Sequence, residues 1–364
     1  MRTINLKRRL GWIILLVLAV IIKVISVNPE WVERYYTYGV YPVIATVLRF
    51  SLGWIPLSIG DILYIVLMIW LGYKIARLIR RIRKKQFSKS YGYGFIRRTI
   101  FLILFVYVVF YGLWGLNYSR QGIASQLQLK EQQSTTADLD TLVRLLHSKL
   151  NDQAQLLTPA MRDSFKSKRN LFLNASLLYQ IAGTKYAFLS YKGYSVKPSL
   201  FSYIGNYLGF QGYYNPFTGE AQVNTTVPAS VEPFVASHEI AHQLGYAKES
   251  EANFVGFLAC RLHPSVNFKY SVYFDMYHYA IRELAFADSL RARSYDSSLN
   301  LRVKKDIADY IEFYKKYKNP IEPYIDKMYS YFLKANNQPK GKRSYNEVVT
   351  WLIAYYKKYG KDVI

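Results

Sequence analysis

Three apolar runs lie in the first third of the chain, and each is long enough to cross a membrane. They cover residues 10–27, 56–76 and 99–116. A hydrocarbon layer about 30 Å thick needs roughly 20 such residues in a helix. The first run is followed by Asn-Pro-Glu-Trp rather than by a small-residue cleavage site, which favours an uncleaved anchor over a signal peptide. The pattern predicts a membrane anchor of three helices over residues 1–117.

The stretch between the first two runs, residues 30–52, alternates polar and apolar positions in the manner of an amphipathic helix. Such a segment is expected to lie along the membrane surface or to cover the membrane helices. A fourth crossing is not predicted.

The remainder, residues 118–364, is predicted to be a mainly α, α+β domain. Helical periodicity extends over most of it. Residues 210–227 differ, because they are rich in aromatic, Thr and Val residues and are interrupted by Asn-Pro and Gly, which predicts a short β-hairpin or edge strand. Helices are expected at about 138–153, 160–183, 233–244, 249–262, 268–288, 301–316, 320–335 and 345–359.

The formal charge of +24 is distributed unevenly. Residues 1–9 and 74–98 together carry fourteen Lys or Arg and no acid, whereas residues 24–55 carry only two basic residues. Positive-inside bias therefore predicts a cytoplasmic N-terminus and a cytoplasmic loop over 77–98, in an inner (cytoplasmic) membrane. Three crossings then place residues 118–364 outside the cytoplasm. Charge of this kind favours membrane lipids as partners, and nucleic acid is not expected as one.

Residues that suggest chemistry are concentrated at 238–242, which read His-Glu-Ile-Ala-His. On a helix, His238 and His242 are one turn apart on the same face, so their imidazoles can share one tetrahedral metal ion. Glu239 lies about 100° round the helix, where it can reach a metal-bound water without being a ligand. The spacing predicts a Zn²⁺ site with Glu239 as the general base of hydrolysis.

A second helix that begins near Glu249 is expected to supply the third ligand, after Gly245 ends the first. Glu249 and Glu251 compete for this role, because two residues apart they point to nearly opposite sides of a helix. Glu249 is favoured, since it shares its face with Ala252 and Asn253. Alanine permits close helix approach, and Asn253 could accept a hydrogen bond from a ligating His. Either carboxylate could instead be a solvated residue at a helix start.

At HEIAHQLG followed by ESEANF, the sequence resembles the gluzincin branch of the zincin metallopeptidases. This resemblance implies that His238 and His242 are zinc ligands, that Glu239 is the base, and that Glu249 is the third ligand. The Asp often found in such motifs is replaced by Asn253, and the gap between His242 and Glu249 is shorter than usual.

Over nearly its whole length the chain is similar to a bacterial membrane family known as a domain of unknown function, with three N-terminal membrane helices and an outer zincin-like domain. The matching stretches are GWIPLSIGDILY, WGLNYSRQG, GYYNPFTGEAQVN, HEIAHQLGYAKESEANF and GKRSYNEVVTWLIAYY. In a zincin-like fold, residues 216–224 would occupy the place of the edge strand along which a peptide substrate pairs. Glu220 would then face the cleft or be a surface charge. Tyr345 is a further cleft candidate, with packing as the favoured interpretation.

Three functions fit these observations. The favoured one is a membrane-anchored zinc metallopeptidase, a hydrolase that acts on a protein or peptide substrate outside the cytoplasmic membrane. The alternative is a non-catalytic envelope protein with a structural zinc site of four protein ligands, the fourth being His263 or Glu251. The third is a scaffold that binds lipid or cell wall through its basic surface.

Overall fold

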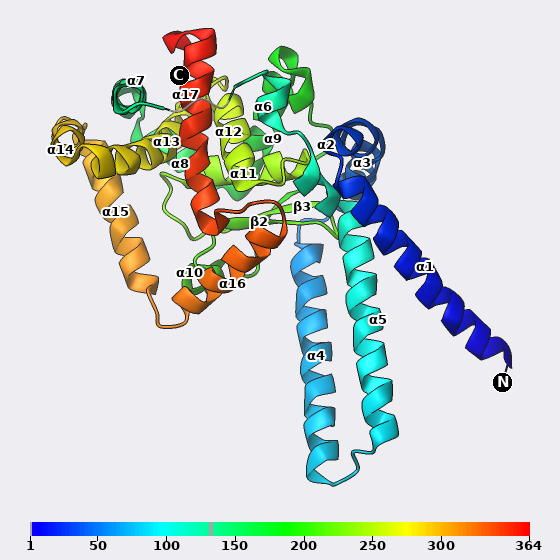
Figure 1. Ribbon diagram of the computed structural model, residues 1–364. Coiled ribbons are helices and arrows are strands. Elements are labelled where there is room, and N and C mark those ends of the chain that lie inside the picture. The colour runs from blue at the N-terminus through cyan, green and yellow to red at the C-terminus, as the bar shows by residue number, and fades with distance from the viewer. Residues whose placement is uncertain (1, 131–133) are drawn as a thin grey trace.

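The computed structural model describes residues 2–130 and 134–364, and it is mainly helical (Figure 1). Three long helices, α1 (Arg2–Ser26), α4 (Ile59–Arg83) and α5 (Lys89–Leu113), extend from a globular body that contains the other helices and the sheet (Figure 1). All three are long and apolar enough to cross a membrane, which confirms the three apolar helices predicted from the sequence.

The basic segment expected to be a loop over residues 77–98 is largely helical. Helix α4 continues to Arg83 and α5 begins at Lys89, so only residues 84–88 connect them. Lys and Arg are good helix formers, and at a helix end their long side chains reach water while the backbone stays hydrogen-bonded.

The amphipathic segment forms α2 (Pro29–Trp31), the π-helical segment Val32–Val40 and α3 (Tyr41–Leu52), and it packs on the globular body. Glu33 forms a buried ion pair with Arg120 at 2.8 Å. Arg49 donates to the backbone oxygens of Lys192 at 2.7 Å and Gln243 at 3.2 Å. Gln243 is the last residue of the helix that carries the His-Glu-x-x-His motif, so this segment supports the site.

A small sheet of three strands lies between the long helices and the body, in the order β1-β3-β2. The strands are β1 (Val196–Pro198), β2 (Gly212–Asn215) and β3 (Glu220–Val223), and β3 pairs parallel with β1 and antiparallel with β2. The predicted hairpin is thus present as β2–β3. The assignment of residues 216–224 to the edge strand is wrong, because β3 is the central strand and the edge next to the motif helix belongs to β2.

Helices α11 (Glu232–Gln243) and α12 (Glu249–Cys260) form the centre of the body, and every residue of both is buried. Their close approach depends on Gly256, where a Cβ would meet the Phe234 ring at 2.9 Å. The surrounding helices are α6 (Ile123–Gln126), α7 (Thr136–Leu156), α8 (Pro159–Asp163), α9 (Lys168–Lys185), α10 (Ser202–Leu208), α13 (Val266–Ala287), α14 (Ser289–Ser297), α15 (Leu301–Tyr317), α16 (Glu322–Ala335) and α17 (Glu347–Tyr359).

Glu220 joins the long helix α4 to the sheet. Its carboxylate accepts hydrogen bonds from the backbone N–H groups of Ile59 at 3.1 Å and Gly60 at 2.6 Å, and it pairs with Lys197 at 3.1 Å. The first N–H groups of a helix lack intrahelical partners and attract negative charge. Both interpretations of Glu220 from the sequence, a cleft residue or a surface charge, are therefore wrong, since this side chain is fully buried as the cap of α4.

Candidate metal centre

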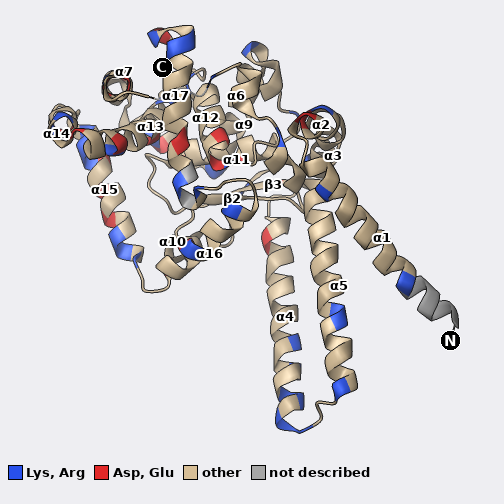
Figure 2. Cartoon of the chain, in the orientation of Figure 1, with Lys and Arg blue, Asp and Glu red and all other residues tan. Residues whose placement is uncertain are grey.

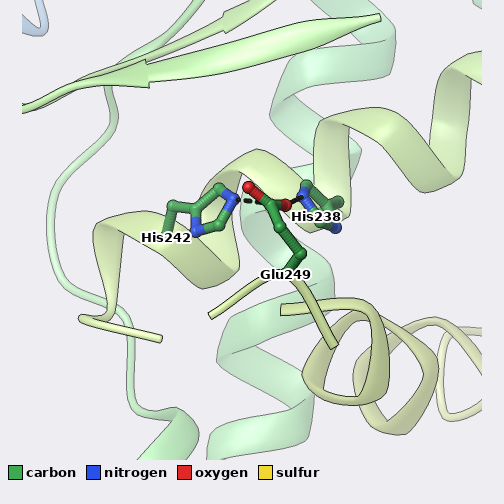
Figure 3. A group of neighbouring side chains, drawn as sticks. All are labelled: His238, His242 and Glu249. Atoms are coloured by element: carbon green, nitrogen blue, oxygen red, sulfur yellow. Dashed lines mark hydrogen bonds and ion pairs between the residues drawn. The ribbon is translucent and has the colours of Figure 1, made fainter. Parts of the chain in front are cut away.

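A tight turn between α11 and α12 brings the motif histidines and Glu249 together (Figure 3). Gly245 in this turn has a φ of +84°, a conformation that glycine adopts without strain. Glu249 Oε2 lies 3.2 Å from His238 Nε2 and 3.5 Å from His242 Nε2. The three potential ligand atoms all lie within 4.8 Å of one another, so one ion could contact all of them.

The two imidazoles are held with their Nε2 atoms toward Glu249. His242 Nδ1 lies 2.7 Å from the backbone oxygen of Tyr246, so Nδ1 carries a proton and Nε2 is the nitrogen left to bind a metal ion. The Asn253 side chain is near the His238 ring and favours its protonated form, as expected for a residue that orients a ligand. Two imidazole nitrogens and one carboxylate oxygen are a donor set that suits Zn²⁺, so the residues present fit this ion.

The charges of the three groups are strongly coupled. Burial opposes ionisation of Glu249, but the two imidazoles, His242 foremost, lower the pKa of its carboxyl. Burial lowers the pKa of His238, whereas interaction with Glu249 outweighs burial at His242 and raises its pKa to about 9. Glu249 is thus an anion flanked by the two imidazoles, and its negative charge is stabilised by His242.

Glu239 lies beside the cluster against strand β2. Its carboxylate is close to Gly212, where an added Cβ would meet Glu239 Oε1 at 2.6 Å, so a glycine is required at this point of the strand. Glu239 Oε2 is buried without a hydrogen-bond partner. Burial, with a smaller contribution from Glu249, raises the pKa of the Glu239 carboxyl to about 8. A carboxyl whose pKa lies near neutrality can both take up and release a proton.

The cluster and Glu239 line a cavity of about 560 Å³. Tyr329 of α16 also lines it and donates to Glu249 Oε1 at 2.7 Å, and the Tyr345 hydroxyl lies 3.3 Å from that of Tyr329. Tyr345, for which packing was the favoured interpretation, is thus a cavity residue. The sequence offered no signal for Tyr329, because α16 is distant from α12 along the chain and only the tertiary fold brings Tyr329 to Glu249.

The other proposed ligands lie elsewhere. Glu251 is next to Gly122, and its Oε1 is 3.5 Å from Lys248 Nζ. His263 follows the far end of α12 and accepts a hydrogen bond from the Ser265 N–H at 3.0 Å. Within the described residues, the potential metal-binding group that contains His238 has three members and no fourth His, Cys, Asp or Glu.

Comparison with known families gives one match. Residues 36–353 match a family model described as "Protein of unknown function (DUF3810)". No curated protein and no solved structure matches the chain. The matched range includes α4, α5, the sheet and the candidate metal-binding cluster, whereas α1 precedes it, so α4, α5 and the candidate site are parts of one family unit.

Proposed function

We propose that this chain, which belongs to the DUF3810 family, is a membrane-anchored zinc metallopeptidase of zincin-like type. The observation that carries the proposal is the convergence of His238, His242 and Glu249 within 4.8 Å, next to the unpaired carboxylate of Glu239 on a cavity wall. A structural site would leave no reason for a buried, unpartnered carboxylate beside the ligands.

Glu239 is the residue that would move protons. Zinc held by these ligands supplies a Lewis acid that polarises a peptide carbonyl and makes water easier to deprotonate. Glu239 takes the proton of the attacking water and delivers it to the leaving amine. The absence of a side chain at Gly212 leaves the space that this carboxylate occupies.

Strand β2 offers a backbone template for an extended substrate. The Asn224 N–H donates to the Gln211 oxygen, and the pairs Tyr213–Gln222 and Asn215–Glu220 follow in register. Bonded and non-bonded pairs alternate in an antiparallel ladder, so Gly212 and Tyr214 direct their backbone groups away from β3. Both residues line the cavity, where a peptide could pair with them by strand addition.

The distribution of charge favours action outside the cytoplasmic membrane. Lys and Arg gather at the connection between α4 and α5, at the end farthest from the globular body (Figure 2). Positive-inside bias assigns that end to the cytoplasm and the metal-binding body to the other side.

The alternative, a non-catalytic envelope protein with a structural zinc, requires four protein ligands in a closed site. His263 and Glu251, the residues expected to complete it, lie away from the cluster. A cluster of three ligands on a cavity wall leaves a coordination position for water or substrate, which supports the catalytic interpretation.

The test uses the full chain purified in detergent and a mixture of fluorogenic peptides of randomised sequence. We expect about one zinc per chain, lost in His242→Ala, and cleavage that Glu239→Gln abolishes while zinc is retained. Glu312→Gln, an exposed carboxylate on α15, is the matched control and should cleave as the wild type does. Purified protein that binds no zinc, or unaltered cleavage by Glu239→Gln, would contradict the proposal.

A further inference from the structure

The cavity does not end at the metal ligands but continues along the long helices. Helix α5 contributes Ile103, Val106, Tyr107 and Phe110 to its lining, and α4 contributes Tyr64. The four α5 positions have the spacing of a single helix face. The lining is therefore polar at the metal end and apolar or aromatic along the helices.

With α5 crossing the membrane and Leu113 at its outer boundary, the apolar end of the cavity would lie within the hydrocarbon layer. Ile103 is ten residues before Leu113, the end of α5, which corresponds to about 15 Å along the helix axis. That distance is about half of a hydrocarbon layer. Ile103 is 64% exposed and Val106 is 44% exposed, so the groove between α4 and α5 is open on the side that lipid would cover.

Both walls of the groove are fixed to the catalytic centre. Trp114, which follows α5, donates from its indole N–H to the backbone oxygen of His242 at 3.0 Å. On α4, Tyr64 stacks on Tyr213 of β2, and the Tyr213 hydroxyl donates to Asp61 in the first turn of α4. These contacts fix the position of the groove relative to the free edge of β2 and to the proposed metal ligands.

We propose that the substrate is a polypeptide with an apolar membrane anchor next to the bond that is cleaved, and that it reaches the site laterally, through the groove between α4 and α5. This inference rests on the proposed peptidase function and specifies its substrate class. Of the lining residues on α4 and α5 none is charged, so this end of the cavity offers an anchor apolar surface, while the peptide part meets Glu239 and the metal ligands.

An apolar anchor gains little free energy when it moves from the bilayer into the groove, because both surroundings are apolar. The catalytic advantage comes from holding the substrate close to the site. Held in the membrane, the substrate meets the site at a raised effective concentration. Held in the groove, it presents its scissile bond at the height of the metal, which adds the advantage of orientation.

The test uses the full chain in lipid nanodiscs and one set of randomised fluorogenic peptides in three forms. The first carries a palmitoyl group, the second a C-terminal apolar helix, and the third neither. We expect kcat/KM to be about tenfold or more higher for an anchored form than for the free form, which corresponds to about 1.4 kcal/mol. The two anchored forms tell an acyl anchor from a helical one.

Val106→Trp fills the groove and should bring the ratio of anchored to free kcat/KM down toward one. Leu102→Trp is the matched control, because Leu102 is an exposed residue of α5 that does not line the cavity, and it should keep the wild-type ratio. Equal kcat/KM for all three forms, or a ratio that Val106→Trp and Leu102→Trp change alike, would overturn the inference while leaving the peptidase function intact.

A binding measurement tests the groove independently of the peptidase function, even where no cleavage occurs. The anchored and free peptides are titrated against Glu239→Gln in nanodiscs, which does not depend on turnover. We expect an anchored peptide to bind more tightly than the free one. This difference should be lost in Glu239→Gln/Val106→Trp and kept in Glu239→Gln/Leu102→Trp. Such a result supports binding of the anchor in the groove even if the wild type proves inactive. Equal binding of both forms overturns it.

Discussion

Helices α11 and α12 bury four carboxylates, Glu232, Glu239, Glu249 and Glu251, in a part of the body where an unpaired charge would be costly. Glu232 is paired with Lys168, Glu249 with the two histidines, and Glu251 with Lys248. Glu239 is the one of these four without an ion pair, although one oxygen of Glu251 also lacks a hydrogen-bond partner. At the scale of single residues, the lack of an ion pair separates the candidate base from the carboxylates that hold structure or candidate ligands.

Tyr329 supports the third ligand from outside the cluster. Removal of its hydroxyl in Tyr329→Phe leaves Glu249 Oε1 without its donor at 2.7 Å. We expect zinc affinity to fall by about tenfold, at the low end of what loss of an outer-shell partner costs. Competition with a zinc chelator measures it. Tyr331→Phe, on the exposed face of the same helix, should leave the affinity unchanged, and an equal loss in both variants would contradict the role of Tyr329.

His263 makes stability depend on pH. Burial, aided by the nearby Lys269, lowers the pKa of His263 to about 4, below its ordinary value of about 6.5. As pH falls from about 6.5 to about 4, the unfolded chain binds a proton that the folded chain does not, so stability is lost over this range. In zinc-free protein, we expect the drop in Tm between pH 7 and pH 5 to be smaller for His263→Gln than for the wild type. An equal drop would contradict this linkage.

At the scale of elements, the sequence predicted several features that depend on local spacing, although the loop expected over residues 77–98 is largely helical. The apolar runs gave three long helices, the position of Gly245 gave the end of α11, and the hairpin at 210–227 is present. The preference for Glu249 over Glu251 as the residue that faces the histidines could also be argued from helix geometry, and the structure brings Glu249 to them.

What the sequence could not predict depends on partners distant along the chain. Glu220 is separated from its hydrogen-bond partner Gly60 by 160 residues, and Tyr329 is 80 residues from Glu249. No periodicity identifies such pairs. The same holds for strand order, because a two-stranded hairpin has no central strand until β1 pairs with β3.

Glu220 should be essential to the junction between α4 and the sheet. Glu220→Gln leaves Lys197 buried without its anion and weakens the cap of α4, and breaking a buried pair from one side costs about 3 kcal/mol or more. We expect a clear loss of thermal stability in detergent. The variant Glu220→Gln/Lys197→Met removes both charges and should recover part of this loss. Asp163→Asn, in an exposed ion pair with Lys166, should have little effect.

At the scale of the whole molecule, the globular body and the long helices differ in the surroundings that their surfaces suit. Most buried apolar residues of the globular body pack into one large core, whereas the long helices expose most of theirs. Exposed apolar surface of this extent indicates contact with lipid. The candidate metal centre lies where the two parts meet, because α11 contacts both β2 and the indole of Trp114.

The orientation of the two parts is testable with single cysteines, because the natural Cys260 is the only cysteine, is buried, and can be replaced in Cys260→Ala. Gln86→Cys lies in the basic connection between α4 and α5, and Ser297→Cys lies on the surface of the globular body. If the basic end faces the cytoplasm, a membrane-impermeant maleimide should label Ser297→Cys in intact spheroplasts and Gln86→Cys only after the membrane is opened. The reverse pattern would place the metal centre in the cytoplasm, and the candidate substrates would then be polypeptides anchored on that side.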